Sequence, residues 1–143
     1  MVARALILVV DDDTAVLNSL GFMLETEGFE VCAFSDIGEL LHADSIREAN
    51  CLVVDYRMPA MNGFDVLRAL RRRRITAPAI LITPRSDETL VGRAVAAGFA
   101  RVVEKPHLED ELVGAIRELT AQIGGAGDRP GDSTTENPLR TIR

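Results

Sequence analysis

The sequence is short of aromatic residues and cysteine, with no tryptophan, one tyrosine and two cysteines among 143 residues. Cys32 and Cys51 show none of the CxxC or Cys/His spacings that bind zinc or form redox pairs, so we expect two buried free thiols in a reducing compartment. No apolar run approaches the ~20 residues of a membrane span, and the short run after residues 1–4 does not suit a secretory signal. These absences predict a cytoplasmic protein without a membrane partner.

Positive charge is also scarce, because 16 lysines and arginines stand against 22 aspartates and glutamates and leave a net charge of −6. Apart from the short run Arg71–Arg74, no predicted helix carries a basic face, which disfavours direct binding to nucleic acid. The length suits one domain with a substantial core. We expect that domain to span residues 1–123, followed at 124–143 by a disordered tail or linker rich in glycine, proline, serine and threonine.

Apolar strand-like runs alternate with helical periodicity five times, which predicts βα repeats with helices on both faces of a mainly parallel sheet. The predicted strands are residues 5–10, 30–34, 51–54, 79–83 and 101–103. The predicted helices are residues 14–27, a short segment capped by Ser35 or Asp36, residues 63 to about 74, 87–97 and 108–123. The phenylalanines are expected in the core, at positions 22, 29, 34, 64 and 99.

Charged side chains stand at the ends of three predicted strands. Asp11 and Asp12 follow the first strand, Asp55 follows the third and Lys105 follows the fifth. Because the carboxyl ends of parallel strands can meet at one crevice beside a switch in strand order, we expect these residues to be neighbours. Carboxylates ~4 Å apart repel by roughly 4 kcal/mol at an effective dielectric of about 20, so one lysine cannot balance the cluster. Carboxylate, water and phosphoryl oxygens suit Mg²⁺, which predicts a magnesium and phosphate site.

Asp55 is central among these acids and is placed to attack phosphorus as a carboxylate nucleophile, with Mg²⁺ and Lys105 stabilising charge on the equatorial oxygens. The product would be an aspartyl phosphate. Taken singly, Asp11 and Asp12 would be helix-capping acids, Lys105 a surface cation and Thr83 a β-branched strand end. Their common position at strand ends favours the functional interpretation.

The combined pattern resembles the receiver domain of two-component response regulators over about residues 4–123. The motifs that carry the resemblance are Asp11-Asp12, Asp55 with Met58-Pro59 and Gly63 after it, Thr83, and Lys105-Pro106. The resemblance implies an α/β, flavodoxin-like (βα)5 fold, a three-layer sandwich around a parallel five-stranded sheet of order 2-1-3-4-5. It further implies a signalling phosphoacceptor that supports its own phosphotransfer and autodephosphorylation and is not otherwise an enzyme.

By the same resemblance, Asp55 accepts a phosphoryl group from a histidine kinase or a histidine phosphotransfer protein. Asp11, Asp12, Asp55 and the backbone carbonyl of Arg57 are then expected to hold Mg²⁺.

Lys105 is expected to contact the phosphoryl group, and Thr83 to hydrogen-bond it after transfer. A cis peptide bond is expected before Pro106. The added charge would draw in the loop after the fourth strand and change the surface of the fourth helix, fifth strand and fifth helix. That surface would serve a downstream protein or a second copy of the chain. The tail alone does not separate a stand-alone receiver from one cut from a longer regulator.

The sequence departs from the receiver pattern at several positions. Val102 stands three residues before the lysine, where receivers generally carry a tyrosine or phenylalanine that acts as a rotating switch partner. Pro84 removes an amide donor beside the phosphate site. Arg57 and Arg85 stand at positions that tune the lifetime of the phosphate in receiver domains, and we expect both long cations to shield it from water.

Two alternative functions stay open. One is a receiver-like scaffold that is never phosphorylated, an idea that Val102 and Pro84 keep alive. The other is a phosphatase with an aspartyl nucleophile of the DxDxT kind, suggested by the run Asp11–Thr14. That motif requires threonine at position 15, where this chain has Ala15.

Overall fold

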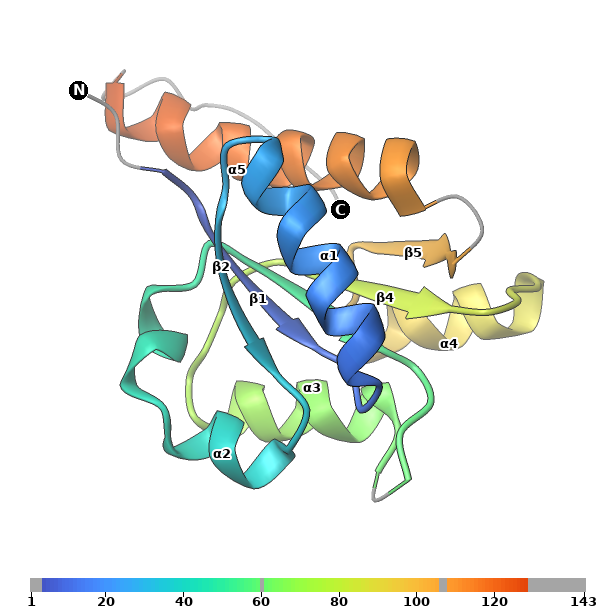
Figure 1. The fold of residues 1–143 in the computed structure, drawn as a ribbon. Coiled ribbons are helices and arrows are strands. Elements are labelled where there is room, and N and C mark those ends of the chain that lie inside the picture. The colour runs from blue at the N-terminus through green and yellow to red at the C-terminus, as the bar shows by residue number, and fades with distance from the viewer. Residues whose placement is uncertain (1–3, 60, 106–107, 129–143) are drawn as a thin grey trace.

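A computed structural model of the chain describes residues 4–59, 61–105 and 108–128. Its centre is one five-stranded parallel sheet of order β2-β1-β3-β4-β5 (Figure 1), which confirms the predicted fold class and strand order. The strands are β1 (Leu6–Val10), β2 (Glu30–Phe34), β3 (Cys51–Asp55), β4 (Ala79–Thr83) and β5 (Arg101–Glu104).

Five α-helices connect and flank these strands: α1 (Thr14–Thr26), α2 (Ile37–His42), α3 (Gly63–Arg72), α4 (Glu88–Ala97) and α5 (Val113–Asp128). A 3-10 turn (Asp44–Glu48) follows α2 and a π-helical turn (Leu108–Leu112) precedes α5. Short polar side chains begin four of the helices by accepting backbone N–H bonds, which satisfies donors that a helix N-terminus leaves free. These caps are Asp13, Asp36, Asn62 and Asp87.

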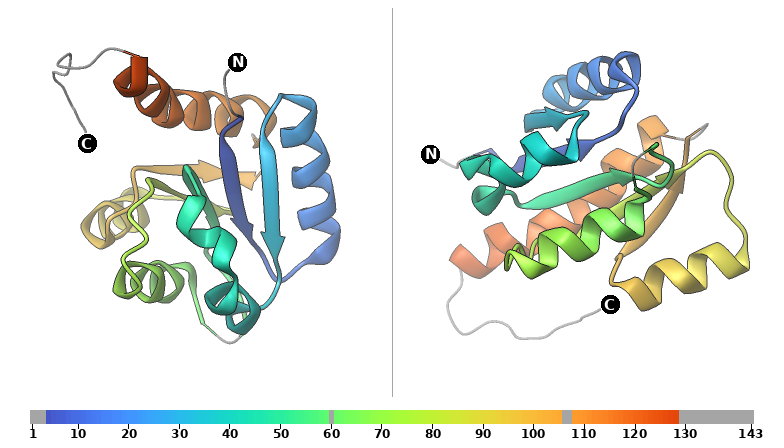
Figure 2. Two further views of the ribbon diagram at one scale, coloured as in Figure 1. Left: turned by 90° about the vertical axis from the view of Figure 1, so that its left-hand side faces the viewer. Right: turned by 90° about the horizontal axis from the view of Figure 1, so that it is seen from below.

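The helices form two layers, with α1 and α5 on one face of the sheet and α2, α3 and α4 on the other (Figure 2). Alternating strand residues supply both cores, because successive side chains of a strand point to opposite faces. In β1, Ile7 and Val9 pack toward α1 and α5, whereas Leu8 and Val10 pack toward the other layer. Burial on both faces explains why these strands are continuous apolar runs.

Two details differ from the sequence-based predictions. Helix α5 continues to Asp128, five residues beyond its predicted end at residue 123, because each added residue of a helix that has already formed gains a hydrogen bond. Phe22, predicted in the core, is 75% exposed on α1, because it lies off the stripe that faces the sheet.

No helix in the described part of the chain is both long and apolar enough to cross a membrane.

Candidate functional site

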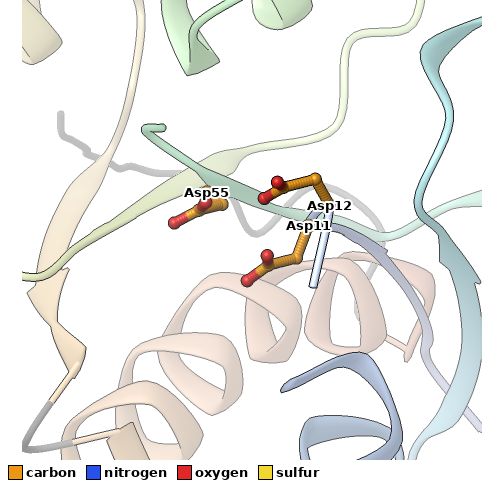
Figure 3. A group of neighbouring side chains, drawn as sticks. All are labelled: Asp11, Asp12 and Asp55. Carbon is orange, nitrogen blue, oxygen red and sulfur yellow. The ribbon is translucent and has the colours of Figure 1, made fainter. Parts of the chain in front are cut away.

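The strand order brings three acidic side chains to one edge of the sheet. Asp11 directly follows β1, Asp12 comes next, and Asp55 is the last residue of the neighbouring strand β3. One carboxylate oxygen from each of the three lies within 4.8 Å of the others. Figure 3 shows the three carboxylates side by side at the ends of these strands. The predicted convergence of these residues is therefore confirmed.

Lys105 supplies the positive charge nearest to these acids. Its Nζ lies 3.3 Å from Asp55 Oδ1 and 3.8 Å from Asp11 Oδ2, and its side chain is 30% exposed. Neither contact is a well-formed hydrogen bond, since both of those oxygens are buried without a hydrogen-bond partner among the described residues. A buried carboxylate oxygen that lacks a partner is costly. The lysine thus compensates the acid pair only in part.

The site holds protons more tightly than carboxyl groups do in water. Burial, reinforced by the neighbouring charge of Asp11, raises the pKa of Asp55 to about 6, while Lys105 acts in the opposite direction. Burial also raises the pKa of Asp11, although the N–H of Asp13, which donates to Asp11 Oδ1 at 3.0 Å, favours the ionised form. Desolvation outweighs the single lysine at both carboxyls.

A hard divalent cation fits this set of donors. Asp11 and Asp55 each present a buried oxygen without a hydrogen-bond donor, and Asp12 adds an exposed carboxylate on the solvent side. Mg²⁺ prefers such oxygen ligands and keeps several waters when few protein ligands are available. An open depression beside the acids is lined by Asp12, Tyr56, Arg57, Met58, Pro59 and Asn62.

The connection from β3 to α3 is held close to the site by Gly63. Its N–H donates to the carbonyl of Tyr56 at 2.9 Å. A Cβ at this position would lie 2.8 Å from both the carbonyl oxygen of Asp55 and Leu81 Cδ1. Only glycine allows the helix to approach the strand so closely. The site residue Asp55 is therefore fixed by backbone packing immediately behind it.

Thr83, the last residue of β4, is buried but makes no hydrogen bond with Asp55 in the described structure. Its hydroxyl instead donates to the carbonyl of Arg85 at 2.9 Å. The next residue along, Ser86, donates its N–H to Glu104 Oε2 at 2.8 Å. The loop after β4 is thus folded back on itself and tied to the end of β5.

No motif in the sequence points to Glu104 as a site residue. Glu104 directly precedes Lys105, which places it near the site, but the partner of its carboxylate lies 18 residues away in the sequence.

The other predicted site residues lie around this centre. Val102 is half-buried and packs into the core on the α2, α3 and α4 side. Arg57 and Arg85 are exposed, and neither forms an ion pair with another described residue. Pro106 lies outside the described residues, so the cis peptide bond before it stays a prediction.

Comparison with known proteins identifies the family of this chain. The family model of the response regulator receiver domain matches residues 7–117. The chain belongs to this family.

Curated relatives agree with that assignment. The receiver is 36% identical over 113 residues to the response regulator protein TodT of Pseudomonas putida, a match that covers 79% of this chain and 50% of TodT. It is 32% identical over 122 residues to the transcriptional regulatory protein FixJ of Bradyrhizobium diazoefficiens, covering 85% of this chain and 60% of FixJ. The chain thus spans half to three-fifths of the length of these relatives.

Solved structures share the fold. A CheY-like response regulator receiver domain from Methanospirillum hungatei superposes with a TM-score of 0.74 at 29% identity, covering 87% of this chain and all of that one. The response regulator TrrA from Thermotoga maritima was solved in complex with Mg²⁺ and BeF. It gives a TM-score of 0.70 at 25% identity, covering 81% of this chain and 99% of TrrA. The receiver is therefore a response-regulator signalling domain, and its acidic cluster is consistent with a phosphoacceptor.

Proposed function

We propose that this receiver accepts a phosphoryl group on Asp55 from a histidine kinase or a histidine phosphotransfer protein. The observation that carries the proposal is the buried Oδ1 of Asp55, which has no hydrogen-bond partner among the described residues and lies 3.3 Å from Lys105 Nζ. A carboxylate oxygen of Asp55 attacks phosphorus, and the bond between phosphorus and the donor nitrogen breaks. The imidazole leaves with that electron pair, and the product is an acyl phosphate on Asp55.

Asp11, Asp12, Asp55 and the backbone carbonyl of Arg57 would hold Mg²⁺ at this site. When bound, Mg²⁺ neutralises the acids and the charge that develops on the phosphoryl oxygens. Support comes from the buried oxygens of Asp11 and Asp55 that lack hydrogen-bond partners. The structural relative TrrA was solved with Mg²⁺ and BeF.

Lys105 would contact the phosphoryl group, and Thr83 would hydrogen-bond it after transfer. For this the Thr83 hydroxyl has to leave the carbonyl of Arg85, which links phosphorylation to a movement of the loop between β4 and α4.

The output would pass through the surface of α4, β5 and α5, where Val91 and Val95 of α4 are exposed, to a downstream protein or to a second copy of the chain. Val102, on β5 of this surface, would replace the usual aromatic switch residue. The cis bond before Pro106 would belong to the same arrangement.

The domain would extend through the end of α5 and not stop at residue 123. It would be followed by a tail or linker and act in the cytoplasm. Curated relatives named transcriptional regulators suggest a longer protein that controls transcription through another domain.

Arg57 and Arg85 would lengthen the life of the acyl phosphate by shielding it from water, since both are exposed and free of ion pairs among the described residues. Autodephosphorylation should be faster in Arg57→Ala and Arg85→Ala than in the wild type. Unchanged rates of phosphate release would reject this role.

The phosphatase alternative is disfavoured by Asp13. In a DxDxT site this residue would act on the substrate, whereas its carboxylate here caps α1 and accepts from the N–H groups of Ala15 and Val16. The alternative of an unphosphorylated scaffold still rests on the aliphatic Val102 on β5 and on Pro84, which lacks an amide donor.

Incubation with acetyl phosphate and Mg²⁺, followed by intact-protein mass measurement, tests the proposal. We expect one added phosphoryl group on the wild type and none on Asp55→Asn. Asp44→Asn is the matched control, because Asp44 is exposed in the 3-10 turn that leads to the opposite end of β3. Phosphate release without an adduct would favour a phosphatase. Absence of both, with acetyl phosphate and with phosphorylated kinase, would favour the scaffold.

A further inference from the structure

The carboxylate of Glu104 ties the loop after β4 to the end of β5 but has no part in the proposed phosphotransfer. Glu104 is the last residue of β5 and lies in register with Thr83 of β4. Its Oε2 accepts the N–H of Ser86 at 2.8 Å in a half-buried position. A hydrogen bond to a charged acceptor is stronger than one between neutral groups. This bond therefore anchors the loop that follows Thr83.

The loop's other polar attachments in the described structure are local. The Thr83 hydroxyl donates to the carbonyl of Arg85, and Asp87 caps α4 by accepting the N–H of Leu90 at 2.8 Å. Both partners of each bond belong to the β4–α4 segment itself. The bond from Ser86 to Glu104 is the polar attachment that reaches a different strand. Movement of the loop relative to β5 therefore has to break or stretch it.

We propose that Glu104 is a positioning residue that holds the loop in its unphosphorylated arrangement and so weakens the affinity of the site for a phosphoryl group. The inference rests on the proposed function of Asp55. A phosphoryl group at Asp55 would attract the Thr83 hydroxyl away from the carbonyl of Arg85. That carbonyl and the N–H of Ser86 belong to the same planar peptide group, so the bonds to Thr83 and to Glu104 hold one peptide from its two sides. An interaction made in one state alone biases the equilibrium against the other state.

The chain contains a natural fluorescent probe next to Asp55. Tyr56 is the only tyrosine, the chain has no tryptophan, and this residue directly follows Asp55. Its fluorescence can follow the binding of beryllofluoride, a phosphoryl mimic, at saturating Mg²⁺. We expect Glu104→Ala to bind beryllofluoride roughly tenfold more tightly than the wild type, since it loses a charge-assisted bond of the unphosphorylated state.

Two further variants separate the bond from the charge. Glu104→Gln keeps an acceptor for Ser86 and should shift the affinity much less than Glu104→Ala. Glu48→Ala removes the same charge from an exposed residue of the 3-10 turn, and should leave the affinity unchanged. Equal gains in Glu104→Gln and Glu104→Ala would overturn the proposal, because the charge alone would then explain them.

The amide proton of Ser86 gives an independent readout by NMR. In the wild type its resonance should move upfield when beryllofluoride binds, toward the position that it takes in unliganded Glu104→Ala. A Ser86 resonance that does not move on binding would show that the bond persists in both states and would overturn the inference. Failure of the wild type to bind beryllofluoride or to take a phosphoryl group would overturn the proposed function as well, so the two failures are distinguishable.

Discussion

Two loops leave the same edge of the sheet, and they are held in different ways. The connection from β3 to α3 is fixed by close backbone packing, with Gly63 against the carbonyl of Asp55. Next to it, the rings of Tyr56 and Phe64 meet edge to face with centroids 5.3 Å apart. The connection from β4 to α4 is held by polar contacts, the bonds of Thr83 to Arg85 and of Ser86 to Glu104.

This difference separates a fixed part of the site from a movable one. Close packing resists displacement because protein interiors have few voids to give way. Hydrogen bonds in a partly exposed loop contribute only modest net stability, because water can replace either partner. A new charge at Asp55 can therefore outcompete the contacts of Thr83 while leaving the packing around Gly63 intact.

Gly63→Ala should have the largest effect on stability, because it disrupts the closely packed connection from β3 to α3. A methyl group placed 2.8 Å from backbone and Leu81 forces the helix away from the strand, and we expect a loss of about 3 kcal/mol in the free energy of unfolding. Urea unfolding measures this loss of stability. Gly92→Ala in α4, where a Cβ would meet nothing within 4 Å, is the control and should gain up to about 1 kcal/mol. Similar losses in both variants would contradict the packing argument.

The buried charge of Asp55 should have the next largest effect on folding stability, and this effect should depend on pH. Its pKa is about 6 in the folded protein against an ordinary value of 3.8, so between these values the folded state binds more protons than the unfolded state. Stability without metal therefore falls as pH rises from about 4 to above 6, by roughly 2 kcal/mol from this group.

Unfolding free energies measured from pH 4 to 7 in a chelator test this prediction. Asp55→Asn should lose that part of the pH dependence and be more stable than the wild type at neutral pH. Saturating Mg²⁺ should stabilise the wild type and much less the variant. Parallel pH curves for the two proteins would show that Asp55 is not a strained buried carboxylate.

Thr83→Val should have the smallest effect on stability, because the hydroxyl that it removes bonds only within the loop after β4. Loss of the hydroxyl bond to Arg85 should cost about 1 kcal/mol in urea unfolding, and Asp55 should still take a phosphoryl group. After phosphorylation the amide resonances of residues 85–87 should shift less than in the wild type. Thr26→Val removes a similar bond to Phe22 in α1 and should leave those shifts unchanged. A shift pattern identical to the wild type in Thr83→Val would remove this residue from the response.

Much of the fold was predictable because its determinants are local. Continuous apolar runs gave the strands to within about one residue, and Asp13, Asn62 and Asp87 mark helix starts by their chemistry. The convergence of Asp11, Asp55 and Lys105 followed from strand topology, since parallel strands end at the same edge.

The remaining features depend on tertiary contacts that no local pattern encodes. The exposure of Phe22 depends on which stripe of α1 faces the sheet. The bond from Ser86 to Glu104 joins residues 18 apart, and the bond of the Thr83 hydroxyl to the carbonyl of Arg85 depends on how the loop folds back. Such details decide how the site responds but leave no periodic signal in the sequence.

The most direct test of a phosphoaccepting Asp55 is to locate the phosphoryl group after reaction with acetyl phosphate and Mg²⁺. Borohydride reduces an acyl phosphate to an alcohol, so peptide mass mapping of the reduced protein identifies the modified carboxyl group. We expect homoserine at position 55, formed only when Mg²⁺ is present. Reduction at another position, or an unreduced Asp55 in protein that carries a phosphoryl group, would contradict the account.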